Sequence, residues 1–572
     1  MRKDDGPTLR RILRLAPWPV RRRIFRAAQA RLLPRIAPER RLRVARALMP
    51  LPAPRRHRPA APGATIRVRT AAGRVPARVV ASSAPSRVRR ENLDRVTGTL
   101  DGGGVAWFRV PATDPLRTAL AVRETDRRTA LRLLKRTARR DHGRILTVGA
   151  GVVAVCWPVS DPGGTLVLGA EHACEVEFWR EHGDRLIAPR RNPVADSIPA
   201  GEPEVDAPEP VFGDFSDPAD TTAYRTRRIF TAVGPDRIGF PVDAVVTWVD
   251  GGDPAWQRRK ARALAGNEWV TEVNRQAAND SRYASRDELR YALRAVHCFA
   301  PWIRHVFLVT DDQVPAWLDL GHPGLTLVGH REIFGTTGTL PTFNSQAIES
   351  RLHRIPGLAE HFLYLNDDMI LGRPVTPDLF FTPGGLTKFF PSKNQVDLDD
   401  RGPRDRPADS AAKNNRRLIR EMFGRVLTRK MMHTPYPSRR SVLEQIERHF
   451  HEQVRTTAEH QFRHPDDVSL LSSLQQYYAY LTGQAVTGTI SYQYTDLADA
   501  ATPVRLATLL RHRHMDAFCL NDVDTRGEAV AVQDALLAEF LPAYLPFPSP
   551  YELAQPRAGT TAVPRPAPRL AA

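Results

Sequence analysis

Carboxylate and amide side chains follow three apolar, β-branched runs in the second half of this 572-residue chain. They are Asp250 and Asp253, Asp311 and Asp312, and Asn366, Asp367 and Asp368. Carboxylates that share a site repel one another unless a cation neutralises them. Mg²⁺ (or Mn²⁺) takes oxygen ligands and leaves positions for substrate phosphates. Spacing alone leaves two interpretations open, a metal–nucleotide site or ordinary solvated turns.

A polar stripe in the predicted helix 344–355 indicates a second kind of chemistry. Ser345, Glu349 and His353 are four residues apart, so they share one face of that helix. Ser345 would lie in the first turn, where free backbone N–H groups and the helix dipole favour a phosphate. A solvated polar face remains the alternative for this stripe.

Four apolar runs, and the helices between them, must position these side chains. The runs are 242–249, 306–310, 325–328 and 362–365. Ser285 and Glu288 have the spacing of a capping box, which predicts a helix start. Strands that alternate with helices predict a mostly parallel, doubly wound α/β sheet with flanking helices. Ligands bind such sheets beyond the carboxyl ends of the strands, where the acidic residues fall.

Longer segments of this half resemble blocks of the Stealth family. They are DAVVTWVDGGDPAW (243–256), DELRYALR (287–294), LPTFNSQAIE (340–349), FLYLNDD (362–368), MHTP (432–435), Phe462-Arg463 and FCLND (518–522). The family contains bacterial capsule-polysaccharide phosphotransferases and the animal GlcNAc-1-phosphotransferase. The resemblance covers about half of the chain, in the family order.

The resemblance implies a nucleotide-diphospho-sugar-transferase-like fold and a Mg²⁺-dependent reaction. In that reaction a sugar-1-phosphate moves from a nucleotide-sugar donor to a hydroxyl of a saccharide acceptor, and a nucleoside monophosphate leaves. Phosphoryl transfer of this kind needs an in-line hydroxyl, neutralised phosphate oxygens and a stabilised leaving phosphate.

The resemblance also implies roles for individual residues. Catalytic roles fall on Glu349, Asp368, His433 as general base on the acceptor hydroxyl, and Arg463 on the donor diphosphate. Substrate-binding roles fall on Asp250, Asn344, Ser345, Asn366 and Arg463. Metal-binding roles fall on Asp253, Asp367, Asp368, Asn521 and Asp522.

We therefore expect a sugar-1-phosphate transferase of capsule or exopolysaccharide synthesis. One alternative is a conventional nucleotide-sugar glycosyltransferase, which would release a nucleoside diphosphate. The other is a basic polyanion-binding or scaffolding protein that retains an inactive enzyme fold.

The first part of the chain carries none of this resemblance. Short apolar runs between 64 and 200, broken by Gly and Asp-Pro turns and joined by one clear helix at 127–139, predict a small β-rich α+β domain. Pro- and Asp-rich residues 201–237 predict a linker, and 238–545 the catalytic domain. Residues 546–572, rich in Pro and Ala, predict a disordered tail.

Positive charge is concentrated at the N-terminus. The first 60 residues hold 18 Arg or Lys against three acidic residues, so they carry three quarters of the net charge of +20. Short basic amphipathic helices in 1–63, which ends in a Pro-rich linker, favour contact with an anionic membrane surface. A solvated tail without a partner is the alternative, and nucleic acid is not the expected partner.

Other features point to the cell interior. No apolar run approaches the ~18 residues of a membrane-spanning helix, and no secretory signal is recognisable. The four cysteines lie far apart in the sequence, which predicts free, buried thiols. We expect a cytoplasmic protein, peripheral to the inner membrane face if the basic tail binds lipid.

Overall fold

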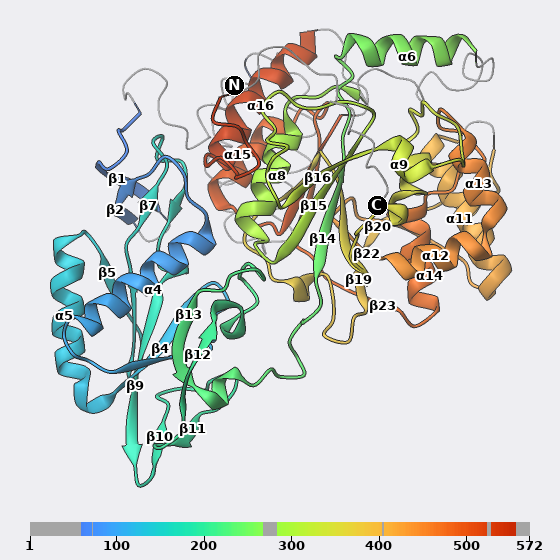
Figure 1. Ribbon diagram of the computed structural model, residues 1–572. Helices are drawn as coiled ribbons and strands as arrows, with labels where there is room; N and C mark the ends of the chain where they lie inside the picture. The colour runs from blue at the N-terminus through green and yellow to red at the C-terminus, as the bar shows by residue number, and fades with distance from the viewer. Residues whose placement is uncertain are drawn as a thin grey trace, which may run out of the picture.

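The computed structural model describes residues 40, 59–70, 73–266, 283–402, 405–522 and 528–555. Two regions lie side by side in Figure 1, an N-terminal region in blue to green and a C-terminal region in green to red. The basic helices expected before residue 59 fall outside the described residues, except for Arg40. No helix among the described residues is both long and apolar enough to cross a bilayer.

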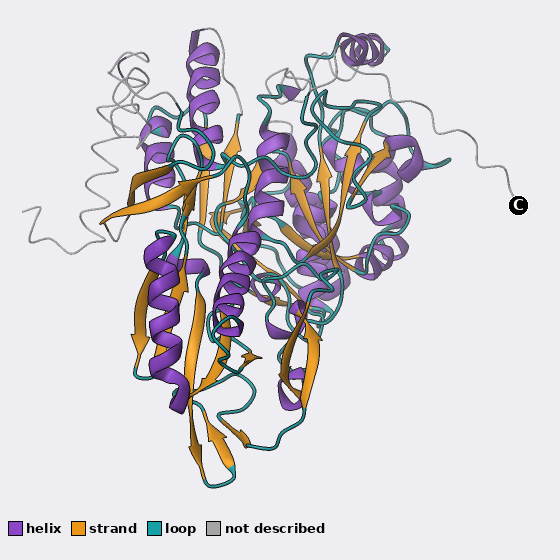
Figure 2. Ribbon diagram, turned by 60° about the vertical axis from the view of Figure 1, so that its left-hand side comes forward, coloured by secondary structure: helices purple, strands orange, loops and turns teal. Residues whose placement is uncertain are grey.

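The N-terminal region, residues 59–231, is mainly β. Its strands are β1 (Thr65–Thr70), β2 (Gly73–Val79), β3 (Trp107–Val110), β4 (Thr118–Arg123), β5 (Arg144–Gly149), β6 (Val152–Cys156), β7 (Val159–Ser160), β8 (Val167–Leu168), β9 (Cys174–His182), β10 (Arg185–Ile187), β11 (Ser197–Pro199), β12 (Glu204–Pro208) and β13 (Ala223–Arg227). Helices α4 (Pro85–Asp101) and α5 (Arg127–Arg140) lie side by side against its main sheet (Figure 2).

This main sheet extends beyond the predicted domain. Its strand order is β11-β10-β9-β4-β3-β13-β12, with β6 added beside β9 and β5 beside β6. The prediction that 201–237 is a linker is wrong, because β12 and β13 pair within this sheet and bury Ala207, Tyr224 and Thr226. Helix α4 was not predicted, since its apolar positions are few and Gly98 interrupts them.

The C-terminal region, residues 242–555, alternates strands and helices. Its strands are β14 (Val242–Thr247), β15 (Ile303–Thr310), β16 (Leu325–Gly329), β17 (His361–Asn366), β18 (Met369–Leu371), β19 (Thr387–Phe389), β20 (Pro391–Gln395), β21 (Arg429–Met431), β22 (Tyr436–Arg439), β23 (Ala485–Thr487), β24 (Tyr492–Asp496) and β25 (Ala517–Asn521). Its helices are α6 (Pro254–Ala265), α8 (Glu288–Phe299), α9 (His330–Phe334), α10 (Ser345–Glu349), α11 (Pro407–Phe423), α12 (Arg440–His449), α13 (His451–Glu459), α14 (Gln475–Leu481), α15 (Thr502–His512) and α16 (Glu528–Tyr544), and a π-helical turn, η9, spans Leu470–Leu474.

A five-stranded, mostly parallel sheet forms the centre of this region, as predicted. The order is β16-β15-β14-β17-β22, and only the edge strand β22 is antiparallel to its neighbour. Its buried, β-branched strands pack against α8 on one side, and helices α11 to α14 gather on the other side of the region (Figure 1). The α/β fold class, preceded by a β-rich α+β region, is therefore confirmed.

A second, smaller sheet meets the first at the acidic corner. After β17 the chain turns through Asp367 and Asp368 and continues as β18, which pairs antiparallel with β25. The backbone N–H of Leu520 donates to the carbonyl of Asp368 at 3.1 Å. Residues more than 150 positions apart thus become neighbours, and the end of β25 lies beside the end of β17.

Two local predictions differ from the structure. The helix predicted over 344–355 ends at Glu349. His353 lies in a separate 3-10 turn, and its imidazole ring pairs with Glu447. Ser285 forms no capping box, because α8 begins at Glu288 and Asp287, in a left-handed conformation, precedes it.

The C-terminal tail also departs from expectation in its first ten residues. Phe547 packs between Val88 and Val159 of the N-terminal region, and Glu552 accepts two hydrogen bonds from Arg294 of α8 at 2.7 Å. Apolar and acidic anchors within a Pro-rich segment therefore fix it across both regions. Residues 556–572 lie outside the described part of the chain.

Candidate active site

A cavity of about 450 Å³ opens beyond the carboxyl ends of β14, β15 and β17. Nine residues predicted for the site line it: Ser345, Glu349, Asn366, Asp367, Asp368, His433, Arg463, Asn521 and Asp522. They come from five separate segments of sequence, so the fold brings the predicted blocks together at one sheet edge, where the topology of a parallel α/β sheet places ligands.

Asp368 is held at the junction of the two sheets. Its Oδ2 accepts hydrogen bonds from the Asn521 amide at 3.1 Å and from the Cys519 thiol at 3.2 Å. Its Oδ1 is buried and has no hydrogen-bond partner among the described residues. The arrangement follows from the β18–β25 pairing, which sets Met369 opposite Cys519.

Three carboxylates crowd this corner with different protonation behaviour. Burial, followed by the charges of Glu288 and Asp368, raises the pKa of Asp367 well above its usual value. Burial also raises the pKa of Glu288 to about 7. For Asp368, burial is outweighed by His433 and by the hydrogen bonds from Cys519 and Asn521, so its pKa is lowered and it stays ionised. Such divergent pKa shifts are typical of functional sites.

His433 stands over the same corner. Its Nε2 lies 3.6 Å from Asp368 Oδ1 and 3.5 Å from the Asn366 amide nitrogen. Its Nδ1 lies 3.1 Å from the Tyr436 hydroxyl, whose ring is buried in β22. The short segment from β21 to β22 therefore fixes the ring from one side and leaves Nε2 facing the cavity, the geometry that a general base requires.

Arg463 reaches the N-terminal end of α10. Its NH2 group donates to Ser345 Oγ at 2.7 Å. The loop that carries it is fixed by the fully buried Asp467, which accepts hydrogen bonds from the Asn344 amide at 2.8 Å and from the His464 backbone N–H at 2.8 Å. A guanidinium and a serine hydroxyl side by side suit phosphate oxygens.

Glu349 lies deeper in the cavity wall. It is 5 % exposed, and its Oε2 accepts hydrogen bonds from the backbone N–H and the hydroxyl of Ser472 in the π-helical turn at 3.3 and 3.1 Å. Burial raises its pKa, and Arg463 and His433 oppose that effect only in part. Glu349 thus couples the α10 helix to the segment after Arg463.

Three predicted residues do not line the cavity. Asn344 caps α10 by accepting from the Gln346 N–H, and its amide bonds to Asp467, so it positions rather than contacts a ligand. Because β14 ends at Thr247, Asp250 lies in the turn that follows the strand, where its carboxylate accepts a hydrogen bond from the Gly252 N–H. Asp253 caps α6. Spacing from an apolar run cannot tell a strand-end carboxylate from a helix cap three to six residues later.

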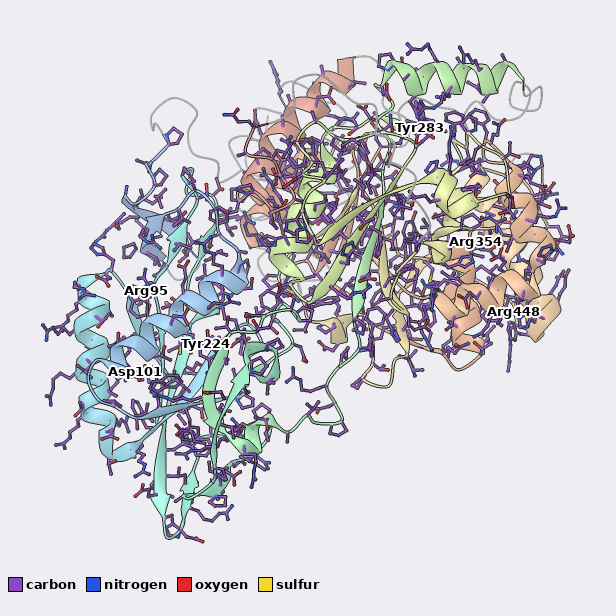
Figure 3. All side chains as sticks on the ribbon, in the orientation of Figure 1. Arg95, Asp101, Tyr224, Tyr283, Arg354 and Arg448 are labelled. Atoms are coloured by element: carbon purple, nitrogen blue, oxygen red, sulfur yellow. The ribbon has the colours of Figure 1, made fainter. Side chains whose placement is uncertain are left out.

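Other lining residues were not predicted. Glu288 lines the cavity, although its spacing from Ser285 predicted only a helix cap. Cys519 lies behind the lining, where its thiol donates to Asp368, and all four cysteines are free and buried, as predicted. Arg286 donates to Asp522 at 2.8 Å and so holds the end of β25. The quoted DELR and FCLND segments contain or adjoin these residues, which is the signal that could have found them. Tyr283, labelled in Figure 3 beneath α6, donates to the Phe343 carbonyl at the rim.

The corner offers ligands for a hard divalent cation. Asp368 supplies a buried, ionised oxygen that accepts no hydrogen bond from the described residues, with His433 Nε2 3.6 Å away, and the carboxylate of Asp367 and the side chain of Asn521 adjoin it. Asp368, His433 and Cys519 also place ligand atoms within 4.8 Å of one another. Burial and the Asp368 charge raise the pKa of the Cys519 thiol well above its usual value, so the thiol stays protonated and the oxygen ligands fit better.

Comparisons with known proteins agree with this geometry. Four conserved regions of the Stealth family match the chain: region 1 at 240–268, region 2 at 282–389, region 3 at 432–480 and region 4 at 507–562. The lining residues that were predicted all fall within regions 2 to 4.

Several exopolysaccharide phosphotransferases are similar to this chain over more than half of its length. The exopolysaccharide phosphotransferase SCO6023 of Streptomyces coelicolor is 46 % identical over 82 % of this chain and 83 % of its own length. The exopolysaccharide phosphotransferase of Nocardia farcinica is 37 % identical over 80 % and 90 %, and CpsY of Mycobacterium tuberculosis is 41 % identical over 55 % and 58 %. The solved galactosyltransferase LgtC, 11 % identical over 52 % of this chain and 95 % of its own, has a TM-score of 0.27, which is too low to assign a fold or function. The similarity to SCO6023 over four fifths of both proteins, together with the four matched regions, shows that the chain belongs to the Stealth family and is a phosphotransferase.

Proposed function

We propose that the chain transfers a sugar-1-phosphate from a nucleotide-sugar to a hydroxyl of a saccharide acceptor in exopolysaccharide or capsule synthesis. The observation that carries the proposal is the convergence of His433, the Asn366–Asp368 corner and the Arg463–Ser345 pair on one cavity. These parts supply a base, an acidic corner and phosphate-binding donors.

The step exchanges a phosphoanhydride bond for a phosphate ester bond. The acceptor oxygen attacks the phosphorus that carries the sugar, a new O–P bond forms, and the bond to the oxygen bridging the two phosphates breaks. His433 Nε2 takes the proton of the acceptor hydroxyl, and the nucleoside monophosphate leaves with the bonding electrons. General-base assistance of this kind is typically worth ~10²–10⁴ in rate.

The remaining residues bind and orient. Arg463 and Ser345 hold non-bridging oxygens of the donor diphosphate, and Glu349 holds Ser472 and the end of α10 in place. Asp367, Asp368 and Asn521 would hold Mg²⁺ or Mn²⁺, which when bound neutralises phosphate charge. Arg286 keeps Asp522 paired at the edge of this group.

The test is a screen of nucleotide-sugars with neutral oligosaccharide acceptors and Mg²⁺, with mass detection of both products. We expect an acceptor heavier by a sugar phosphate, together with a nucleoside monophosphate. An acceptor heavier by a sugar alone, with release of a nucleoside diphosphate, would instead assign a conventional glycosyltransferase.

The same proposal places the basic N-terminus at an anionic membrane surface on the cytoplasmic side. It rests on the charge of residues 1–60 alone. Co-sedimentation with vesicles of anionic lipid should be lost when these residues are deleted. Retention of binding by the shortened chain would place the lipid contact elsewhere.

A further inference from the structure

The cavity has a second wall whose chemistry differs from that of the acidic corner. Strand β21, helix α11 and the π-helical turn η9 contact one another and form it. The wall contributes small and hydroxyl side chains, with two cations: Ala408, Ala412, Ser469, Ser473, Arg429 and Lys430. Among the described lining residues, this wall supplies no carboxylate. It therefore leaves room for a saccharide but does not suit a metal ion.

The two cations of this wall are not equivalent. Lys430 forms an ion pair with Asp409 in the first turn of α11, which neutralises it. Arg429 is exposed, and no carboxylate of the described residues lies within 4.0 Å of its guanidinium. Its backbone carbonyl accepts a hydrogen bond from the Tyr477 hydroxyl at 2.7 Å, which anchors the strand while the side chain stays available.

Arg429 lies close in sequence to the proposed base. It begins β21, which ends at Met431, and His433 follows two residues later; Arg429 and His433 both line the cavity. Four residues of fully extended chain span at most about 14 Å, so the backbone of Arg429 lies no farther than that from His433. An acceptor with its hydroxyl at His433 would run along β21 toward this guanidinium.

We propose that this wall is the acceptor subsite and that Arg429 recognises an anionic group on the acceptor, a phosphodiester one sugar away from the reacting hydroxyl. The inference rests on the proposed function. Each transfer leaves the new sugar joined through its own phosphodiester, so the product of one round carries a phosphate beside the next acceptor hydroxyl. A guanidinium binds such a group through two oxygens at once. The subsite thus prefers a chain that the enzyme has already extended.

The experiment follows successive additions to a neutral oligosaccharide acceptor, with the donor found in the screen. In the wild-type protein, the acceptor KM of the second transfer should be about tenfold below that of the first. A difference of this size corresponds to one additional charge-assisted hydrogen bond to the acceptor. Arg429→Gln should raise the second KM to the level of the first and leave the first addition and the donor KM unchanged. Arg429→Lys should restore part of the difference.

Controls separate the sources of the effect. Arg425→Gln, at an exposed arginine of the loop that precedes β21 and outside the cavity lining, should behave like the wild type. An acceptor with a carboxylate in place of the phosphodiester distinguishes preference for phosphate from preference for any anion. Thermal unfolding of each variant reports whether the fold is intact.

Three results would overturn the inference. The first is equal KM values for both additions in the wild-type protein. The second is a donor KM that rises in Arg429→Gln, which would assign Arg429 to the donor diphosphate. The third is an unchanged second KM in that variant. Failure of the proposed function looks different, because no sugar phosphate would then be added to any acceptor.

Discussion

The two regions of the molecule bury charged groups in opposite ways. In the N-terminal region, Glu209 is 4 % exposed and lies between Arg89 and Arg109, with nitrogen–oxygen distances of 2.6 and 2.8 Å. In the cavity of the C-terminal region, Asp367, Asp368 and Glu288 crowd together. The first carboxylate is fully paired, whereas Asp368 keeps a buried oxygen that accepts no hydrogen bond from the described residues.

The electrostatics reflect this difference. For Glu209, burial would raise the pKa, but the two arginines outweigh it and lower the pKa. For Asp367 and Glu288, burial dominates and raises the pKa of each. A buried charge that is already neutralised by its neighbours stabilises one arrangement of the chain. A group of under-compensated carboxylates leaves capacity for a cation or a substrate.

Removal of the Asp368 charge should have the largest effect. Asp368→Asn keeps the shape and takes away the negative charge, so we expect Mg²⁺-dependent donor binding to vanish and kcat/KM to fall by ~10³ or more. Calorimetric titration of the donor with and without Mg²⁺, beside steady-state kinetics, measures both.

The matched variant is His433→Ala. It should retain Mg²⁺-dependent donor binding while kcat drops by ~10²–10⁴, because the base acts on the acceptor and not on the donor. An Asp368→Asn protein that binds the donor with unchanged Mg²⁺ dependence would remove the acidic corner as the cation site.

The next effect concerns stability alone. Glu209→Gln leaves two buried arginines, Arg89 and Arg109, without their counter-charge, and loss of one partner of a buried pair costs about 3–5 kcal/mol. We expect the free energy of unfolding in urea to fall by that amount while kcat/KM at permissive temperature stays unchanged. A change of kcat/KM at constant stability would show that the N-terminal region contributes to the reaction.

The sequence predicted the central sheet well and its surroundings poorly. Apolar, β-branched runs place β14 to β17 within a few residues of their observed bounds, because buried parallel strands have no other composition. The same reasoning missed β12 and β13, because both strands are short and carry charged residues (EVDAP and AYRTR). Glu209, which follows β12, pairs with Arg89 and Arg109, 120 and 100 residues away, and no local pattern reports such a pairing.

The candidate site shows the same limit. The segments that resemble the Stealth family identified His433, Arg463 and Asp368 from the sequence alone, and these residues line one cavity. Glu288 was interpreted as a helix cap because its spacing from Ser285 fits that motif equally well. Only the packing of α8 against β18, which is non-local, shows that Glu288 shares a corner with Asp368.

The contribution of Glu288 to folding stability should change with pH in the opposite direction from that of a paired carboxylate. Below pH 4.5 both folded and unfolded chains hold its proton. Between pH 4.5 and about 7 only the folded chain does, so stability falls as pH rises through this window. The total is on the order of 3 kcal/mol. Urea unfolding of metal-free protein at several pH values should show this slope in the wild type but not in Glu288→Gln; parallel curves would mean that Glu288 ionises normally.

The smallest expected effect tests a paired carboxylate that serves the cavity. Asp467 is fully buried like Glu209, but its partners, Asn344, His460 and the His464 N–H, fix the loop that presents Arg463 to Ser345. If it acts through that arginine, Asp467→Asn should lower kcat/KM by about tenfold. The same substitution should then change kcat/KM little in a protein that already carries Arg463→Gln.

A double-mutant cycle of Asp467→Asn and Arg463→Gln measures this directly. Residues that act through one another show coupling of about 0.5–3 kcal/mol, whereas independent sites add. Asp466→Asn is the control, because the neighbouring Asp466 is exposed and pairs with Arg401 at the surface. Additive effects would make Asp467 a purely structural residue, the cavity's equivalent of Glu209. Strong coupling would show that the same kind of buried pair can stabilise a fold in one region and aim a substrate-binding arginine in the other.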